Sequence, residues 1–191
     1  MMAELQIAGP TETFTRIATQ IGAQVVSVAS VAEAVGIVAE QVSGSLLLPT
    51  FPTASRFKLK AALGKAGIEV VNESLRSSGS RAEAGLTGVN FAIADTGTLV
   101  LDSTAEDIRL ATTLPPKQFA LLDPRKIVAD GLAAVEPLRR MHQRDPRNYV
   151  AYISGPSRTA DIERVLTIGV HGPKELFILL VPGLSADLLE M

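Results

Sequence analysis

Cysteine and tryptophan are both absent from the 191 residues of this sequence, and histidine occurs only twice. Without cysteine the chain can form no disulfide, offer no thiolate to zinc or to an iron–sulfur cluster, and use no cysteine nucleophile. The two histidines, His142 and His171, are too few for a histidine-rich metal site. We therefore expect this chain to bind no metal and no cofactor of its own.

Long apolar runs and an excess of positive charge are also missing. The longest apolar candidate, Leu176–Val181, ends at Pro182 and is far shorter than the roughly 18 residues that a membrane-spanning helix requires. Lysine and arginine total 18 against 20 for aspartate and glutamate, whereas proteins that bind nucleic acid are usually basic. The first residues also lack the basic start and apolar core of a signal peptide. The sequence thus predicts a cytoplasmic protein with no membrane span and no nucleic-acid partner.

Several common catalytic and nucleotide-binding motifs do not occur. The sequence has no G-x-G-x-x-G after a strand-like run, no Walker A loop, no H-E-x-x-H and no G-x-S-x-G. The usual sequence support for dinucleotide binding and for nucleotide hydrolysis is therefore missing.

The first half of the sequence alternates between helix-like and strand-like segments. Apolar spacing and capping residues predict helices over 14–21, from the capping box Ser30–Glu33, and over 56–66, with strands over 24–28, 45–48 and 68–71. The polar stretch 72–80 is expected to be a surface loop. Alternation of helices with strands that are apolar throughout is typical of a parallel α/β sheet.

The second half predicts a hairpin followed by further strands. Residues 90–94 and 98–101 form two strand-like runs joined by Asp95-Thr96-Gly97, with Gly97 suited to a positive φ. A second capping box at Ser103–Glu106 predicts a short helix, and a longer helix through Arg140 is expected to begin at Asp123 or Asp130. Further strands are predicted over 119–122, 149–154 and 176–181. No repeat or linker divides the chain, so we expect one domain over residues 1–191.

The first candidate site is the segment Ser-Gly-Pro-Ser-Arg-Thr-Ala-Asp-Ile-Glu at 154–163, which is expected to run from a strand into a helical turn. Its hydroxyls and the guanidinium of Arg158 suit a small anion, because free N–H groups converge at the start of a helix. The alternative is structural: Thr159 is only a helix N-cap, and Arg158 pairs with Asp161 or Glu163.

The second candidate combines Gly85-Leu86-Thr87-Gly88 with Asp95-Thr96-Gly97-Thr98. A carboxylate between two strands can have its protonation shifted by burial or by an arginine, and glycine turns let a ligand approach the backbone. Equally, Asp95 and Gly97 can serve only the turn.

The third candidate is the segment 169–176, Gly-Val-His-Gly-Pro-Lys-Glu-Leu. The imidazole of His171 can exchange a proton near neutral pH, and Lys174 adds positive charge beside it. The alternative is that His171 is a turn residue bonded to the backbone.

Three segments of this sequence resemble those of the LUD-domain proteins, and among them the lactate-utilisation protein C (LutC/YkgG) group. They are AGLTGVNFAIADTGTLV at 84–100, SGPSRTADIE at 154–163 and GVHGP at 169–173. The resemblance is close over roughly the C-terminal half, and the N-terminal half agrees in its pattern of helices and strands. The family more often has Glu where this chain has Asp95, and often has His near Gln118. A carboxylate that is one methylene shorter argues against covalent acyl transfer.

This resemblance implies a NagB/RpiA/CoA-transferase-like α/β fold, an open and mainly parallel sheet flanked by helices, with a β-hairpin. It also implies a role in the oxidation of L-lactate to pyruvate beside iron–sulfur partner proteins. A chain without cysteine would depend on such partners for electron transfer. The candidate catalytic residues are Asp95 and His171. The candidate ligand-binding residues are Gly88, Thr96, Gly97, Thr98, Gly155, Ser157, Arg158, Thr159, Asp161, Glu163 and Gly172.

Three functions remain open from the sequence. The first is a non-redox subunit of a lactate-oxidising system that binds a small anion. The second is an independent enzyme for a small anionic metabolite such as an acyl-CoA or a sugar phosphate, with Arg158 holding the anion, Asp95 as base and His171 as proton shuttle. The third is a sensor that binds such a ligand without turnover.

Overall fold

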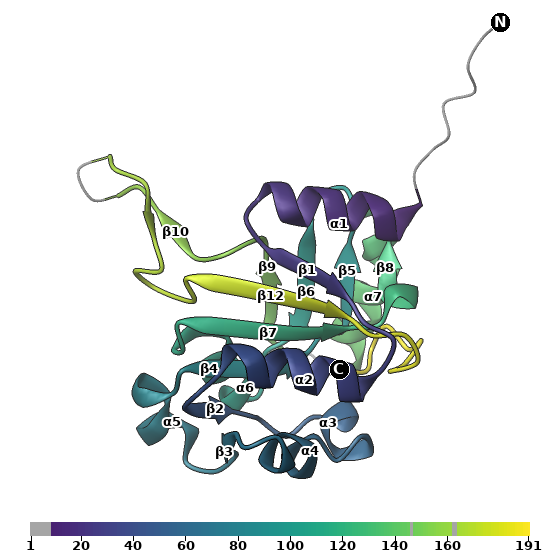
Figure 1. The fold of residues 1–191 in the computed structure, drawn as a ribbon. Coiled ribbons are helices and arrows are strands. Elements are labelled where there is room, and N and C mark those ends of the chain that lie inside the picture. Colours follow the sequence, from purple (N-terminus) through teal and green to yellow (C-terminus); the bar gives the residue numbers. More distant parts are fainter. Residues whose placement is uncertain (1–8, 146, 162–163) are drawn as a thin grey trace, which may run out of the picture.

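A computed structural model describes residues 9–145, 147–161 and 164–191 of the chain. Its main sheet has six parallel strands in the order β1-β12-β7-β4-β2-β3 (Figure 1). The strands are β1 (Gln24–Ser27), β2 (Ser45–Leu47), β3 (Glu69–Val71), β4 (Ala84–Gly88), β7 (Lys117–Leu122) and β12 (Glu175–Leu180). The predicted open, mainly parallel α/β sheet is confirmed.

Helices flank this sheet, with α2 in front of it in the view of Figure 1 and α6 packed against β4. The α-helices are α1 (Pro10–Gln20), α2 (Val31–Gln41), α3 (Pro52–Arg56), α4 (Leu59–Lys65), α5 (Leu75–Ser78), α6 (Glu106–Thr113) and α7 (Gly131–Arg144). Two 3-10 turns, η1 (Gly79–Arg81) and η2 (Pro124–Lys126), complete the helical elements. No helix in the described ranges is long and apolar enough to cross a membrane.

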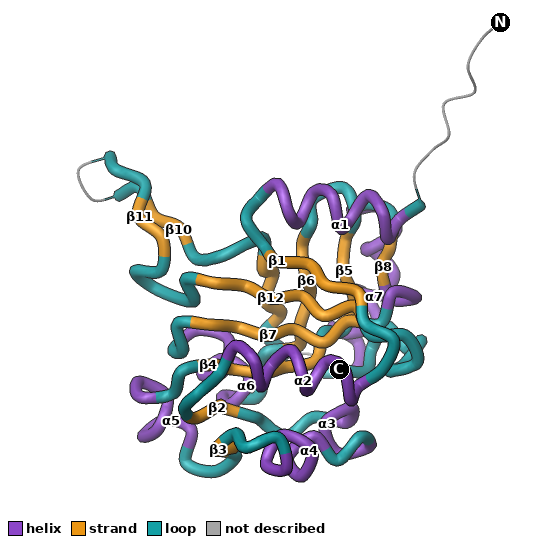
Figure 2. The backbone as a smooth tube through the Cα atoms, viewed as in Figure 1, coloured by secondary structure: helices purple, strands orange, loops and turns teal. Residues whose placement is uncertain are grey.

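A second sheet has four strands in the order β8-β5-β6-β9 and lies behind the first in the view of Figure 2, with its strands crossing β1 and β12. Its strands are β5 (Phe91–Ile93), β6 (Thr98–Asp102), β8 (Ile127–Val128) and β9 (Val150–Ile153). β5 and β6 form the predicted antiparallel hairpin, and Gly97 has the expected positive φ, at 62°. Ala134 and Met141 of α7 pack against Phe91 and Val100 of this sheet. A two-stranded arm, β10 (Arg158–Thr159) and β11 (Thr167–Ile168), projects from the body.

Four local predictions are wrong, and each has a structural reason. The expected helix over 56–66 is instead α3 and α4, separated where Lys58 adopts a left-handed φ of 51°. The expected loop 72–80 contains α5 and most of η1. Ser103 does not cap α6, because its hydroxyl donates to the carbonyl of Tyr149 on the neighbouring chain segment. The segment after Ser154 enters β10 and not a helical turn.

The centre of the main sheet is apolar on both faces. Every residue of β7 and β12 after the first is buried, and the rings of Phe119 and Phe177 stack with their centroids 4.6 Å apart. Burial on both faces is the usual state of parallel strands, and it leaves polar groups mainly at the strand ends. The functional side chains of this protein are therefore to be sought at the two edges where the strands begin and end.

Glu83 ties three segments together at the edge where the strands begin. Its carboxylate accepts the backbone N–H groups of Ser43 and Gly44 at 2.9 and 2.7 Å, and it accepts the Lys117 ammonium at 3.0 Å. The hydrogen bond from Lys117 is the largest effect and, with the backbone bonds, holds the pKa of Glu83 below its usual value against the opposing effect of burial. The charged form of Glu83 thus stabilises the fold.

Replacement of Gly85 by Ala is expected to lower the free energy of unfolding by about 1–3 kcal/mol, because an added methyl group would collide with the Ala111 carbonyl of α6. Gly36→Ala in α2 is the matched control. A methyl group there meets nothing within 4 Å, so the helix should gain about 0.5–1 kcal/mol. Urea unfolding of both variants measures the difference, and equal effects would contradict the close approach of α6 to β4.

The free energy of unfolding of Glu83→Gln is expected to depend less on pH in acid than that of the wild type. Because the pKa of Glu83 is lowered in the folded chain, its stabilisation is present above the unfolded pKa and is lost as the pH falls through the folded pKa. Unfolding free energies measured from about pH 6 to about pH 3 should therefore fall less in the variant than in the wild type. Glu40→Gln, at an exposed position of α2, is the control and should keep the wild-type slope.

Candidate functional site

A pocket of about 440 Å³ lies near the beginning of β7 and β12, beside β9. We call it the β9 pocket. Its walls come from the end of α6, from β7, β9 and β12, and from the loops around Ser157 and His171. The lining residues are Thr112, Thr113, Gln118, Ala151, Tyr152, Ile153, Ser154, Gly155, Pro156, Ser157, Arg158, His171, Gly172, Pro173 and Leu176.

Gln118 is the most unusual side chain of the β9 pocket. It is only 1% exposed, and its amide Nε2 has no hydrogen-bond partner among the described residues. The one other buried side-chain atom of this kind in the described ranges is Oγ1 of Thr87, which does not line the pocket. An unsatisfied buried donor costs about 1–3 kcal/mol. A ligand oxygen placed in the β9 pocket is one means of satisfying this donor.

The two loops of the pocket are held together by backbone hydrogen bonds. Ser157 N–H donates to the Pro173 carbonyl, and Gly169 N–H donates to the Ser157 carbonyl, both at 2.9 Å. A Cβ atom on Gly172 would lie 3.2 Å from the Ser157 hydroxyl oxygen, so the loops are in close contact. The pocket wall that carries Ser157 and His171 is therefore one connected unit.

Arg158 lies between the pocket and the end of α1. Its guanidinium donates to the carbonyl of Ile21, in the turn that follows α1. Gly155, with φ at 73°, also lies against Ile21, and a Cβ atom there would come within 2.5 Å of the same carbonyl oxygen. Because a guanidinium has five N–H donors, the bond to Ile21 leaves others to face a ligand. The free N–H groups expected from a helical turn after Ser154 are not available, since this segment enters β10.

The structure brings together five of the residues predicted from the sequence. Gly155, Ser157, Arg158, His171 and Gly172 all line the β9 pocket.

Thr98 adjoins the pocket, because its hydroxyl lies 2.7 Å from that of Ser154. The other residues of its hairpin lie elsewhere. Asp95 and Thr96 are exposed in the turn and do not line the β9 pocket, and Gly97 packs against Ala18 of α1.

The remaining candidates also lie away from the pocket. Gly88 is at the far end of β4, against Met191. Thr159 pairs with Thr167 on the arm, Asp161 is exposed, and Glu163 falls outside the described residues. A reaction that needs Asp95 and Arg158 on one ligand thus has no support in this geometry.

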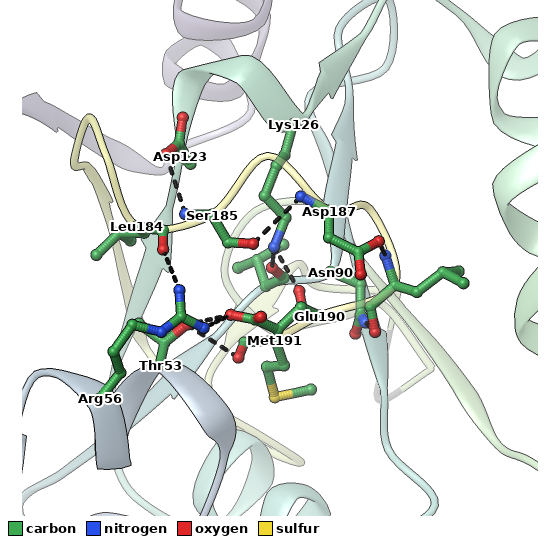
Figure 3. A network of polar contacts seen from close by, with 12 residues as sticks. Thr53, Arg56, Asn90, Asp123, Lys126, Leu184, Ser185, Asp187, Glu190 and Met191 are labelled. Carbon is green, nitrogen blue, oxygen red and sulfur yellow. Dashed lines mark hydrogen bonds and ion pairs between the residues drawn. The ribbon is translucent and has the colours of Figure 1, made fainter.

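A second polar cluster, which sequence reasoning missed, lies at the opposite edge of the sheet (Figure 3). Lys126 of η2 is only 3% exposed and donates to the carbonyls of Val89, at 2.7 Å, and of Glu190. Arg56 at the end of α3 forms an ion pair with Glu190. Thr53 of α3 donates its N–H and its hydroxyl to the Met191 carbonyl, at 3.2 and 3.0 Å.

The charges of this cluster are shifted by their surroundings. Burial lowers the pKa of Lys126 to about 8. For the carboxyl group of Asp123, burial raises the pKa. Hydrogen bonds from the side chain and backbone of Arg125 and from Ser185 N–H outweigh it and hold the pKa of Asp123 below its usual value. Asp123 is thus an ionised anchor for η2 and for the segment that begins at Leu184.

One signal in the sequence could have located this cluster. Asn90 follows β4, and Asp123 to Lys126 follow β7, so both groups stand at the carboxyl ends of adjacent parallel strands. Ligands of open α/β sheets usually bind beyond these ends. The strand order, which decides that β4 and β7 are neighbours, was not predictable from either segment.

Several known proteins are similar to this chain. A crystal structure of a DUF162 family protein from Deinococcus radiodurans matches with a TM-score of 0.66 and 22% identity, over 92% of this chain and 99% of that one. At this identity the match shows the fold alone. An uncharacterized protein of Neisseria meningitidis serogroup B is 42% identical over 52% of this chain and 42% of its own length. Lactate utilization protein C of Bacillus subtilis is 30% identical over 74% of this chain and 66% of its own length.

This chain matches less than half the length of several sequence relatives. The match covers 42% of the Neisseria protein and 41%, 47% and 39% of three proteins named lactate utilization protein C. The family assignment therefore rests on a model that spans most of this chain. The LUD domain model matches residues 11–181. The chain belongs to the LUD domain family.

Proposed function

We propose that this chain is a component of an L-lactate utilisation system, in which it binds a small carboxylate in the β9 pocket and acts with iron–sulfur partner proteins. The single observation that carries the ligand assignment is the buried, unpartnered amide of Gln118 in a pocket shared with Ser157 and Arg158. The proposal for the system rests on relatives that carry the name lactate utilization protein C.

The chemistry of the β9 pocket suits a small carboxylate. A carboxylate is an acceptor only, and the pocket offers donors of three kinds: the Gln118 amide, the Ser157 hydroxyl and the Arg158 guanidinium. Charge-assisted hydrogen bonds to a guanidinium are stronger than neutral ones. Ile153 and Leu176 line the same pocket and suit the methyl group of an anion such as L-lactate.

The redox part of the proposed system belongs to other chains. Oxidation of lactate releases two electrons, and iron–sulfur clusters are usually held by cysteine thiolates, which this sequence lacks. This chain would hold the carboxylate, and the partner proteins would supply the clusters.

Arg158→Gln is expected to weaken the binding of L-lactate by about 10-fold or more, because a hydrogen bond to a charged group contributes about 1.5–3 kcal/mol. Arg164→Gln is the matched control. It removes an exposed arginine of the same arm that does not line the pocket, so its affinity should stay at the wild-type level. The affinities of the wild type and the two variants for L-lactate, pyruvate and phosphate are measured by isothermal titration. If Arg158→Gln binds every one of these anions as tightly as the wild type does, the result counts against the site.

Gln118→Leu separates a ligand-binding role of this amide from a packing role. The substitution removes an unsatisfied donor and keeps a side chain of similar size, so the free energy of unfolding should stay equal or rise. If the amide holds the carboxylate, affinity for L-lactate should fall in the same protein. A stable variant with unchanged affinity would remove Gln118 from the site.

The partner proposal is tested by affinity purification of the tagged chain from its source cells grown on L-lactate. Iron and lactate-dependent dye reduction should co-purify with this cysteine-free chain, and neither should be present when the purified chain is assayed alone. A chain that emerges without iron and inert toward lactate would contradict the proposed role.

A further inference from the structure

The segment 184–191 fills the crevice at the carboxyl ends of the main sheet, although it has no regular secondary structure. Its oxygen atoms accept nearly all the donors that converge there. Asn90 donates its amide to the Leu189 carbonyl at 3.0 Å, and Arg56 donates to the Leu184 carbonyl at 2.7 Å. With the bonds from Thr53 and Lys126 described above, donors from α3, from the end of β4 and from η2 all point at one short stretch of chain (Figure 3). We call these four residues the cradle.

The ammonium of Lys126 is held by neutral oxygens, while the carboxylates of Glu190, Asp123 and Asp187 act on it from a greater distance. Lys126 is buried, yet no carboxylate oxygen of the described residues lies within 4.0 Å of its ammonium, which bonds only to the neutral carbonyls of Val89 and Glu190. A buried charge is normally paired, because its desolvation is costly. An anionic oxygen in place of the Glu190 carbonyl would supply the missing partner.

The shape of the occupant defines the ligand that would fit. Glu190 places its side-chain carboxylate on Arg56 and its own carbonyl oxygen on Lys126. The side-chain carboxylate carbon and the backbone carbonyl carbon of Glu190 are the two ends of one five-carbon chain, which is the skeleton of glutarate. A free dicarboxylate of this length would reproduce both contacts, and it would replace the neutral carbonyl by a second carboxylate.

The surroundings give such a ligand room to enter. A pocket of about 600 Å³ adjoins the segment and is lined by Asn90, Arg144 and Glu190 among others. Within the segment, residues 187–190 bond mainly to one another and to the cradle, as in Leu189 N–H to the Asp187 carboxylate at 3.0 Å. The buried side chains of Leu184 and Met191 anchor the two ends of the segment, so the ligand has to displace only the turn that carries Glu190.

We propose that the cradle of Thr53, Arg56, Asn90 and Lys126 is a binding site for a short dicarboxylate of four or five carbons, and that Glu190 occupies it as an internal substitute that the ligand displaces. The site is separate from the β9 pocket and does not depend on the function proposed for that pocket. Binding at one site can therefore fail without affecting the conclusion about the other.

Binding of this kind takes up protons in mildly alkaline solution. The pKa of Lys126 is lowered to about 8 by burial, with Glu190, Asp123 and Asp187 raising it and Arg56 lowering it further. A carboxylate in contact with the ammonium raises this pKa. Proton uptake on binding should therefore increase as the pH is raised from about 7 to about 9.

The test is a calorimetric titration of the full chain with glutarate, with pentanoate as the monocarboxylate control of equal length. Glutarate should bind and pentanoate should bind at least 10-fold more weakly, because pentanoate cannot engage Arg56 and Lys126 together. Repeating the titration at about pH 8.5 in buffers of different ionisation enthalpy measures proton uptake. Backbone NMR signals of residues 186–191 should shift on addition of glutarate.

Two variants distinguish displacement from simple surface binding. Glu190→Gln removes the competing carboxylate, so it should bind glutarate several-fold more tightly than the wild type. Lys126→Met should lose at least 10-fold in affinity and all proton uptake, and Arg164→Gln, at an exposed position that lines neither pocket, should keep wild-type affinity for glutarate. Since Lys126→Met can reduce folding, the decision rests on the wild type and Glu190→Gln. No glutarate binding by either protein, or equal binding of pentanoate, overturns the proposal.

Discussion

Burial of the main sheet on both faces is the constraint on which the placement of the chemistry depends. From Phe119 to Leu122 in β7 and from Leu176 to Leu180 in β12 every side chain is apolar and buried, with Phe119 stacked on Phe177, so the polar side chains of these strands are confined to their beginnings. Gln118 stands where β7 begins, and Asp123 directly follows its end. One polar side chain thus lies at each end of β7, and one candidate site lies at each of these two edges of the sheet.

The two edges solve the problem of buried polar groups differently. At the beginning of β7, Gln118 is left with an unpartnered amide, which favours an external acceptor. At the end of the sheet, the donors of the cradle are satisfied by carbonyls of residues 184–191, but the charge of Lys126 is not matched by a close carboxylate. A missing hydrogen bond and an unmatched charge are both costs of the folded state, and such costs are often retained where a ligand relieves them.

Sequence reasoning was most successful where the signal is local. The periodicity of apolar residues predicted the α/β alternation, and Asp95-Thr96-Gly97 predicted a hairpin with a positive φ at Gly97. It was wrong where a distant segment decides the outcome, as at Ser103, whose hydroxyl bonds to Tyr149 and not to the start of α6. The clustering of Ser157, Arg158 and His171 followed from motifs, whereas the cradle joins residues from 53 to 126 and could be found only once the strand order was known.

The length of β7 also sets how the two sites can influence each other. A strand of six residues spans about 20 Å, so no small ligand can contact both edges at once. Coupling would have to pass along a fully packed strand, and such a strand transmits displacement poorly unless two discrete states exist. A partner that covers the β9 pocket and a dicarboxylate in the cradle should therefore bind independently. Any interaction between them would point instead to a partner large enough to reach both edges.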